Sequence, residues 1–200
     1  AENPEYPVLD EGNFKDIPNG VEILKTKIWE PYNLFKFITG KKKKERIHNV
    51  FIEEEKPSFS HKLGVWIRGN IFIPDARKFW IRPSVRFLSK YLKENPVDVL
   101  FTNGPPQSTH MIAYAVKKNL GFPWHADFQD PWTQVDYFPQ LMLNPVSKKI
   151  HEKKERLVFL WADKITICSD TWKNDLESIG AKEVGVIVWG YDEDDFQNIT

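Results

Sequence analysis

The spacing of apolar residues along the chain predicts strands and helices that alternate. Short apolar runs that end in polar and turn-forming residues are typical of buried strands, and apolar residues three or four positions apart are typical of helices. From residue 75 onward these two patterns follow one another, with no internal repeat. The expected strands are 97–102, 123–128, 164–168 and 184–188, and the expected helices are one around 83–92 and those at 108–119, 145–162 and 171–179.

Strands that alternate with helices of this length indicate an α/β domain. We expect a Rossmann-like parallel sheet with right-handed crossovers and with helices on both faces. In the 145–162 helix, the pattern predicts buried apolar residues and exposed polar ones. The residues expected to be buried are Ile150, Leu157 and Leu160, and those expected to be exposed are His151, Lys153 and Lys154.

The first seventy residues are less regular. An alternating run at 21–26 predicts a short strand, and the apolar spacing at 30–40 predicts a short helix that Gly40 ends. Residues 46–72 fit neither pattern. A doubly wound domain usually opens with a strand, a tight loop and a helix. We therefore expect a domain at residues 1–190 that lacks this first strand and loop, with an interdomain linker beginning at 191–200.

Composition narrows the class of protein. The chain has 200 residues and 41% apolar residues, enough for one domain with a sizeable core. Its formal net charge of zero argues against a general nucleic-acid binder, and the single cysteine, Cys168, fits a reducing compartment. No apolar run of about 18 residues and no signal-peptide pattern is present. The expected location is therefore the cytoplasm.

Charge is unevenly distributed. Between Lys36 and Lys90 there are 14 Lys and Arg against 5 Asp and Glu, an excess of 9 positive charges. Aromatic residues lie among these cations, and such a region suits an anionic membrane surface. A solvated loop beside core aromatics is the alternative interpretation. The residues proposed to contact a membrane or acceptor are Lys41, Lys42, Lys43, Lys44, Arg77, Lys78 and Trp80.

Two strand ends carry the candidate chemistry. Strand 97–102 runs into a loop that contains Gly104, Pro105, Pro106 and Gln107 and leads into a helix. A hydroxyl at the start of that helix, such as that of Ser108, can cap free backbone N–H groups, and a helix N-terminus can hold a phosphate or carboxylate. An ordinary strand-to-helix turn would explain the same residues.

The next strand ends with two carboxylates. Asp127 lies near the end of strand 123–128, and Asp130 follows it, before Pro131 and Trp132. Because the carboxyl ends of parallel strands lie along one edge of a sheet, we expect both carboxylates to face one crevice with the glycine-proline loop. Paired carboxylates can accept a proton from a hydroxyl or stabilise positive charge on a sugar. A turn that Asp130 opens and a backbone cap by Asp127 are the alternatives.

Several stretches resemble the N-terminal half of GT-B glycosyltransferases, in particular the retaining enzymes of family 4 that assemble surface polysaccharides. The stretches are 102–110 (TNGPPQSTH), 126–132 (ADFQDPW), 162–169 (ADKITICS) and 186–192 (VIVWGYD), with a looser one at 73–80 (IPDARKFW). Two positions depart from the pattern of that family. Gln129 stands where Arg is frequent, and Trp189, at the linker, stands where Asn is frequent.

The resemblance implies an acceptor-binding domain that faces a second, donor-binding domain across a cleft. It implies a retaining transfer of sugar from a nucleotide-sugar to a glycan or lipid-linked acceptor, with no metal or other cofactor, and docking on the inner face of the cell membrane. Asp127 and Asp130 would be the catalytic candidates. The substrate-binding candidates would be Gly104, Pro105, Pro106, Gln107, Ser108, His110, Gln129 and Trp132.

Two other functions stay open at this point. A nucleotide-sugar epimerase shares the GT-B architecture but uses no acceptor. A non-catalytic Rossmann-like binding module would need no donor domain. Metal chemistry is not expected, because the histidines and Cys168 lack the close spacing of metal ligands.

Overall fold

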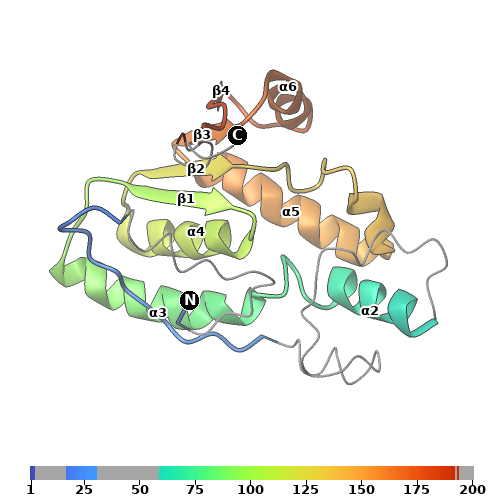
Figure 1. Cartoon of the computed structure of the whole chain (residues 1–200), viewed down its shortest axis with the longest axis horizontal. Helices are drawn as coiled ribbons and strands as arrows, with labels where there is room; N and C mark the ends of the chain where they lie inside the picture. Colours follow the sequence, from blue (N-terminus) through green and yellow to red (C-terminus); the bar gives the residue numbers. More distant parts are fainter. Residues whose placement is uncertain (3–16, 31–58, 192, 194–200) are drawn as a thin grey trace, which may run out of the picture.

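Four parallel strands form the centre of the structure, a computed structural model that describes residues 1–2, 17–30, 59–191 and 193 (Figure 1). They are β1 (Leu100–Gly104), β2 (Trp124–Phe128), β3 (Lys164–Ile167) and β4 (Val184–Val186), and they lie in the sheet in chain order. Between successive strands come α4 (Ser108–Leu120), α5 (Pro145–Trp161) and α6 (Asp170–Ser178). The predicted alternation is therefore confirmed: this is an α/β domain with an all-parallel, Rossmann-like sheet.

Local sequence explains where these helices begin and end. The Asn144 side chain accepts a hydrogen bond from the Ser147 N–H at 2.8 Å and starts α5, with Pro145 in the first turn. The Ser169 hydroxyl accepts from the Trp172 N–H and starts α6 in the same way. Gly121 ends α4 in the left-handed region, at φ 81°, where glycine is favoured.

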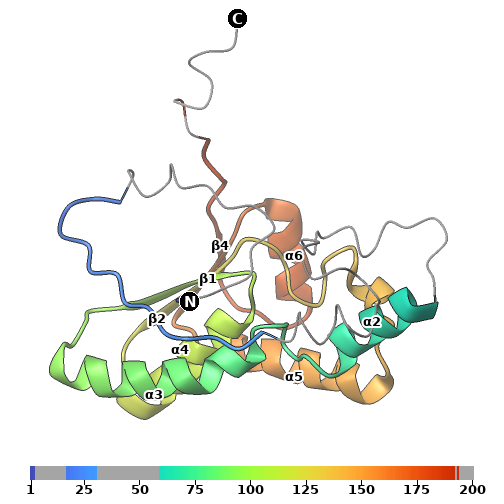
Figure 2. The same cartoon turned by 60° about the horizontal axis from the view of Figure 1, so that its bottom comes forward.

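The two faces of the sheet are covered unequally. Trp124, Ala126 and Phe128 alternate along β2 on one face and are fully buried under α4 and α5. On the other face, Phe101 keeps 59% of its side chain exposed. Figure 2 shows α3, α4 and α5 beneath the sheet.

The expectation of helices on both faces is not met by the described residues. The strand order follows the chain order, so every crossover runs in the same direction. Right-handed crossovers that run in one direction place their helices on the same face. Helices on both faces would require the strand order to reverse, and the described part of the sheet has no such reversal.

Two further helices precede the sheet. The first, α2 (Phe59–Asn70), falls within the region that the apolar spacing left unassigned, and it packs beside the short 3-10 helix η3 (Phe138–Leu141). The second, α3 (Lys78–Glu94), packs against α4 and starts earlier than predicted. Pro83 lies inside α3, in its second turn.

The strand predicted at 21–26 is wrong. Residues 17–30 have no strand and lie along α3, where the Trp80 indole donates to the Thr26 hydroxyl at 2.7 Å and Ile28 is buried (Figure 2). Alternation alone could not specify a strand here, because a strand needs a partner. The helix predicted at 30–40 lies almost entirely outside the described residues.

The predicted orientation of α5 is wrong in part, although Lys153 is exposed as expected and Leu157 is half-buried. His151 is buried, whereas Leu160 and Ile150 keep 76% and 39% of their surface exposed. Ser147, Glu155 and Val158 share the inner face with His151. The polar side chains can lie inside because each has a hydrogen-bonding partner there, as described below.

Candidate functional site

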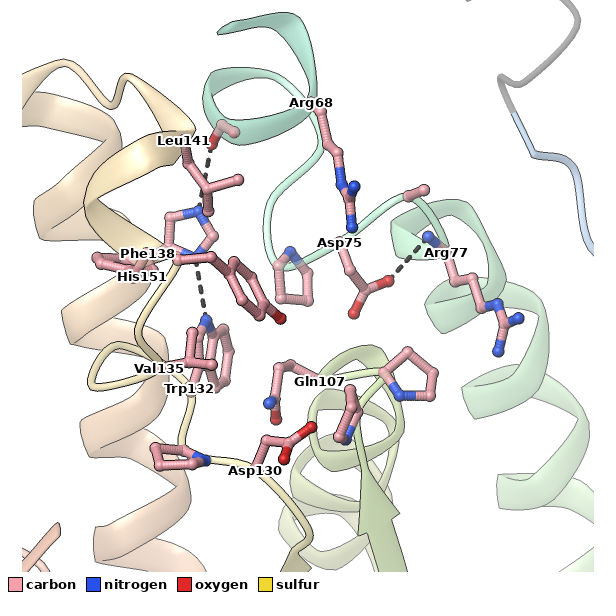
Figure 3. A pocket seen from close by; sticks show the side chains of 17 residues that line it. Arg68, Asp75, Arg77, Gln107, Asp130, Trp132, Val135, Phe138, Leu141 and His151 are labelled. Carbon is pink, nitrogen blue, oxygen red and sulfur yellow. Dashed lines mark hydrogen bonds between the residues drawn. The ribbon is translucent and has the colours of Figure 1, made fainter. Parts of the chain in front are cut away.

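A pocket of about 350 Å³ lies beyond the carboxyl ends of β1 and β2 (Figure 3). Four segments line it: the end of α2, residues 74–77, the β1–α4 loop, and the long connection from β2 to α5, with His151 from α5 itself. In Figure 3, Gln107 and Asp130 lie together on one side, and Arg68 and Asp75 point inward from the opposite side. Ligands of open α/β sheets bind at this edge.

Asp75 fills the position at the start of α4 that an anionic ligand could occupy. Its carboxylate accepts from the Ser108 N–H and from the Ser108 hydroxyl, both at 2.7 Å, and from the Arg77 N–H at 2.8 Å. These donors and the positive end of the helix dipole are thus satisfied from within the chain. The sequence suggested that a ligand phosphate or carboxylate could bind at this helix start, and the structure places the carboxylate of Asp75 there.

The β1–α4 loop is packed tightly against a buried histidine. The Trp124 indole donates to the Thr102 hydroxyl at 2.8 Å, and the same hydroxyl shares a hydrogen bond with Nδ1 of His110 at 2.9 Å, whereas the buried Nε2 of His110 has no hydrogen-bonding partner among the described residues. Burial lowers the pKa of His110 to about 3, so the ring is neutral. A Cβ at Gly104 would lie only 2.6 Å from this Nε2, so the position requires glycine.

Gln107 lines the pocket and has a buried polar atom that is unsatisfied. Its side chain is 7% exposed, and its Oε1 has no hydrogen-bonding partner among the described residues. Buried polar atoms of this kind are rare in folded proteins and call for a ligand or water. The two peptide bonds that precede it, Gly104–Pro105 and Pro105–Pro106, are both cis.

Asp130 is a partly exposed acceptor in the same pocket. It lines the pocket, and within the described part of the chain its carboxylate has neither a hydrogen bond nor an ion pair. Burial raises the pKa of Asp130. Tyr137 lies in the same pocket, and its pKa is raised mainly by burial, against the opposing effect of Arg68. A perturbed carboxyl group in a cleft is a functional-site candidate.

Buried polar contacts hold the wall that carries Asp130 in place. The Trp132 indole donates to Nδ1 of His151 at 3.0 Å, so Nε2 of His151 carries the proton and donates to the Gly69 carbonyl at 3.2 Å. Burial lowers the pKa of His151, consistent with this neutral form. Glu155, 1% exposed, accepts from both the N–H and the hydroxyl of Thr133.

Asp127 does not join Asp130 in the pocket. Alternation along β2 directs it to the opposite face of the sheet, where it accepts from the Asn103 side chain at 2.6 Å and from the Thr166 hydroxyl. Because the Thr166 proton is used in that bond, Nε2–H of His125 donates to the Thr166 oxygen at 2.9 Å. The expected shared crevice therefore contains one of the two carboxylates.

The other substrate-binding candidates divide between the pocket and its support. Pro105, Pro106, Gln107 and Trp132 line the pocket. Gly104, Ser108 and His110 lie buried behind the loop. The Gln129 N–H donates to the Gly104 carbonyl of β1, and the Gln129 carbonyl accepts from the Cys168 thiol at 3.1 Å. Gln129 is not among the residues that line the pocket.

Of the residues predicted to contact a membrane or acceptor, only Arg77, Lys78 and Trp80 lie within the described residues, at the start of α3. Arg77 lines the pocket and forms an ion pair with Glu30 at 3.3 Å. Lys78 donates to the Ile71 carbonyl, and Trp80 bonds to Thr26. Lys41 to Lys44 lie outside the described residues.

Four polar residues that line the pocket were not among the predicted site residues: Arg68, Asp75, Tyr137 and His151. Asp75 caps a helix that begins 33 residues later, so no local motif could show it. His151 was assigned to the outer face of its helix. Only the Trp132 indole, which is buried and needs an acceptor, could have indicated a buried partner.

The described residues contain no group of three or more His, Cys, Asp or Glu side chains that could hold a metal ion. Among them, too, no helix has the length and apolar character needed to cross a membrane.

Comparisons with known proteins found no similarity: no protein-family model, no curated protein and no solved structure matches this chain. The structure itself defines the class of this protein: a Rossmann-like α/β domain with a pocket at the carboxyl edge of its sheet.

Proposed function

We propose that this domain binds the sugar acceptor of a retaining glycosyltransferase with GT-B architecture. The observation that carries the proposal is that Gln107 and Asp130 line one pocket at the ligand-binding edge of the sheet, and that neither Gln107 Oε1 nor the Asp130 carboxylate has a hydrogen-bonding partner among the described residues. Sugar hydroxyls are donors that suit such acceptors. The resemblance of the sequence to GT-B enzymes at the same loops supports this function.

The remaining lining suits a neutral, hydroxyl-rich ligand. Trp132 and Phe138 contribute apolar surface, and Arg68 and Tyr137 contribute donors. Asp75 already occupies the start of α4, which argues against a phosphate there. A pocket with apolar walls and a few polar groups is the usual form of a small-molecule site.

In this proposal a second domain binds the nucleotide-sugar donor, and residues 1–190 bind the sugar acceptor. Asp130 would accept a hydrogen bond from the attacking hydroxyl and orient it toward the donor. Asp127, held by Asn103 and Thr166, would fix the ends of β1, β2 and β3 relative to one another. No strong protein base is needed if the leaving phosphate assists the proton transfer.

The test is sugar transfer by the full-length protein from a panel of UDP-, GDP- and ADP-sugars, with membrane extract as acceptor. We expect Asp130→Asn to reduce transfer at least tenfold, because the NH₂ group of asparagine cannot accept a hydrogen bond that a carboxylate oxygen accepts. Asp136→Asn, an exposed change in the same connection, is the matched control. A folded protein that transfers no sugar from any donor would reject the proposal in favour of an epimerase or a binding module.

A further inference from the structure

The outer face of α5 combines exposed apolar and basic side chains. Val146 and Leu160 keep 67% and 76% of their surface exposed, and Ile150 keeps 39%. Because a helix turns about 100° per residue, residues three, four, seven and eleven apart lie on one face. We name this face the α5 stripe: Val146, Lys149, Ile150, Lys153, Arg156, Leu157 and Leu160.

Packing within the described chain does not explain this stripe. The opposite side of α5 already contributes to the interior, with His151 against Trp132 and Glu155 against Thr133. The inner face thus combines these hydrogen-bonded polar residues with Val158, which is fully buried, and the aliphatic residues of the outer face remain exposed beside basic ones.

The stripe is also positively charged. A shallow hollow on it is lined by Lys149, Lys153 and Arg156 together with Leu157 and Leu160, and Glu152 at its margin is the one carboxylate that lines it. Within the described part of the chain, none of the three cations forms an ion pair. The three cations outnumber the one carboxylate, so the stripe carries a net positive charge.

We propose that the α5 stripe docks on an anionic membrane surface. Cations that surround aliphatic side chains on one helix face suit a lipid interface, where the aliphatic groups enter the acyl boundary and the lysines reach the headgroups. Docking leaves α5 lying in the plane of the membrane. It requires no spanning helix, in agreement with the absence of one among the described residues.

Two other occupants fit the stripe less well. A second copy of the chain would bring like charges together when the same faces meet, which is unfavourable. The core of a protein–protein interface is depleted in lysine and enriched in aromatic residues. Lys149 and Lys153 lie in the middle of the stripe, which has no aromatic residue.

The docking surface stands independently of the proposed acceptor site. The inner side of α5 nevertheless lines the pocket through His151. Since a helix with its side chains is about 10 Å across, docking would hold the pocket close to the headgroups. If the acceptor-site proposal also holds, a lipid-linked acceptor is the substrate class that this placement favours.

The test is sedimentation of the full chain with vesicles made of equal parts phosphatidylglycerol and phosphatidylcholine, at low and at physiological salt. Each cation near an anionic surface strengthens binding about fivefold. We expect the triple variant Lys149→Gln/Lys153→Gln/Arg156→Gln to bind about 100-fold more weakly. Vesicles of phosphatidylcholine alone should bind little of either protein.

A matched triple variant separates the stripe from overall charge. Lys93→Gln/Lys118→Gln/Lys182→Gln removes three exposed cations from other elements and leaves the same net charge. It should bind like the original protein. Equal loss of binding in both triple variants, or no loss in either, would overturn the proposal, because docking would then use another surface or total charge.

A second pair of variants tests the apolar contribution. Val146→Ser/Leu160→Ser should weaken vesicle binding at physiological salt, while Val97→Ser/Val99→Ser, also at exposed positions, should not. Failure of the original protein to bind anionic vesicles at low salt would refute membrane docking. Crosslinks from Lys149 to an acidic partner protein would then indicate that the α5 stripe binds a protein and not a membrane. Loss of docking with sugar transfer intact would leave the acceptor-site proposal standing.

Discussion

Replacing Gly104 by alanine tests the packing behind the pocket. The added Cβ would lie 2.6 Å from His110 Nε2 and 3.0 Å from Gln107 Oε1. Ordinary contacts of this kind are about 3.5 Å, so the ring or the strand must move by about 0.9 Å. His110 is fully buried and its Nδ1 is held by Thr102, so the ring cannot turn away freely. Overpacking of a tight interior costs about 1–3 kcal/mol, and we expect about 2 kcal/mol here.

Urea denaturation measures this change in the free energy of unfolding. The control is Gly190→Ala, where the Cβ would meet nothing within 4 Å, and we expect less than about 0.5 kcal/mol there. In a His110→Ala background the same Gly104→Ala step should cost less, because the ring that obstructs the Cβ is absent. A Gly104→Ala cost below about 0.5 kcal/mol, or an equal cost in both backgrounds, would refute the packing described here.

Three further predictions concern protons and caps. The unfolded chain binds a proton at His110 below about pH 6.5, whereas the folded chain does so only near pH 3, so stability should fall as the pH drops through this range. Between pH 7 and pH 5, protonation of His110 in the unfolded chain should lower the free energy of unfolding by up to about 1.4 kcal/mol per pH unit, as measured by denaturation at the two pH values. The His110→Leu variant should lack this decrease. Asp75→Ala should destabilise the fold by about 1–2 kcal/mol in thermal or urea unfolding, because it leaves the Ser108 donors without acceptors; exposed Asp136→Ala should not. Binding of a ligand to Asp130 should weaken as the pH falls, with a midpoint above the ordinary carboxyl value of about 4, and Asp130→Asn should remove this dependence in a calorimetric titration.

Local patterns were sufficient for the regular part of the fold. The helix from Ser108 and the strand that ends at Phe128 were predicted within one residue, because their apolar spacing and bounding turn residues are continuous in the sequence. The strand at 21–26 was wrong, since alternation does not reveal whether a neighbouring strand exists. The orientation of α5 was wrong because partners from distant segments, Trp132 and Gly69, compensate for the burial of His151.

The candidate site was predictable only in part. The loop with Gln107 and the turn with Asp130 were identified because both follow strands that end abruptly. Asp127 was placed beside Asp130, although strand alternation directs its side chain to the other face. Asp75 and Arg68 come from segments that the fold brings in from far along the chain, and no spacing rule links them to the pocket.

The proposal that the pocket binds a sugar acceptor is tested most directly by chemical-shift mapping. The labelled chain would be titrated with oligosaccharides and with a lipid-diphosphate-linked sugar. We expect shifts at the Gln107 side-chain amide and the Trp132 indole N–H, which belong to pocket residues, and none at the Trp80 indole, because Trp80 does not line the pocket. Saturable shifts at the first two groups, reduced by Asp130→Asn, would support the acceptor site. Shifts confined to the sheet face around Asp127, or no shift with any sugar, would contradict it.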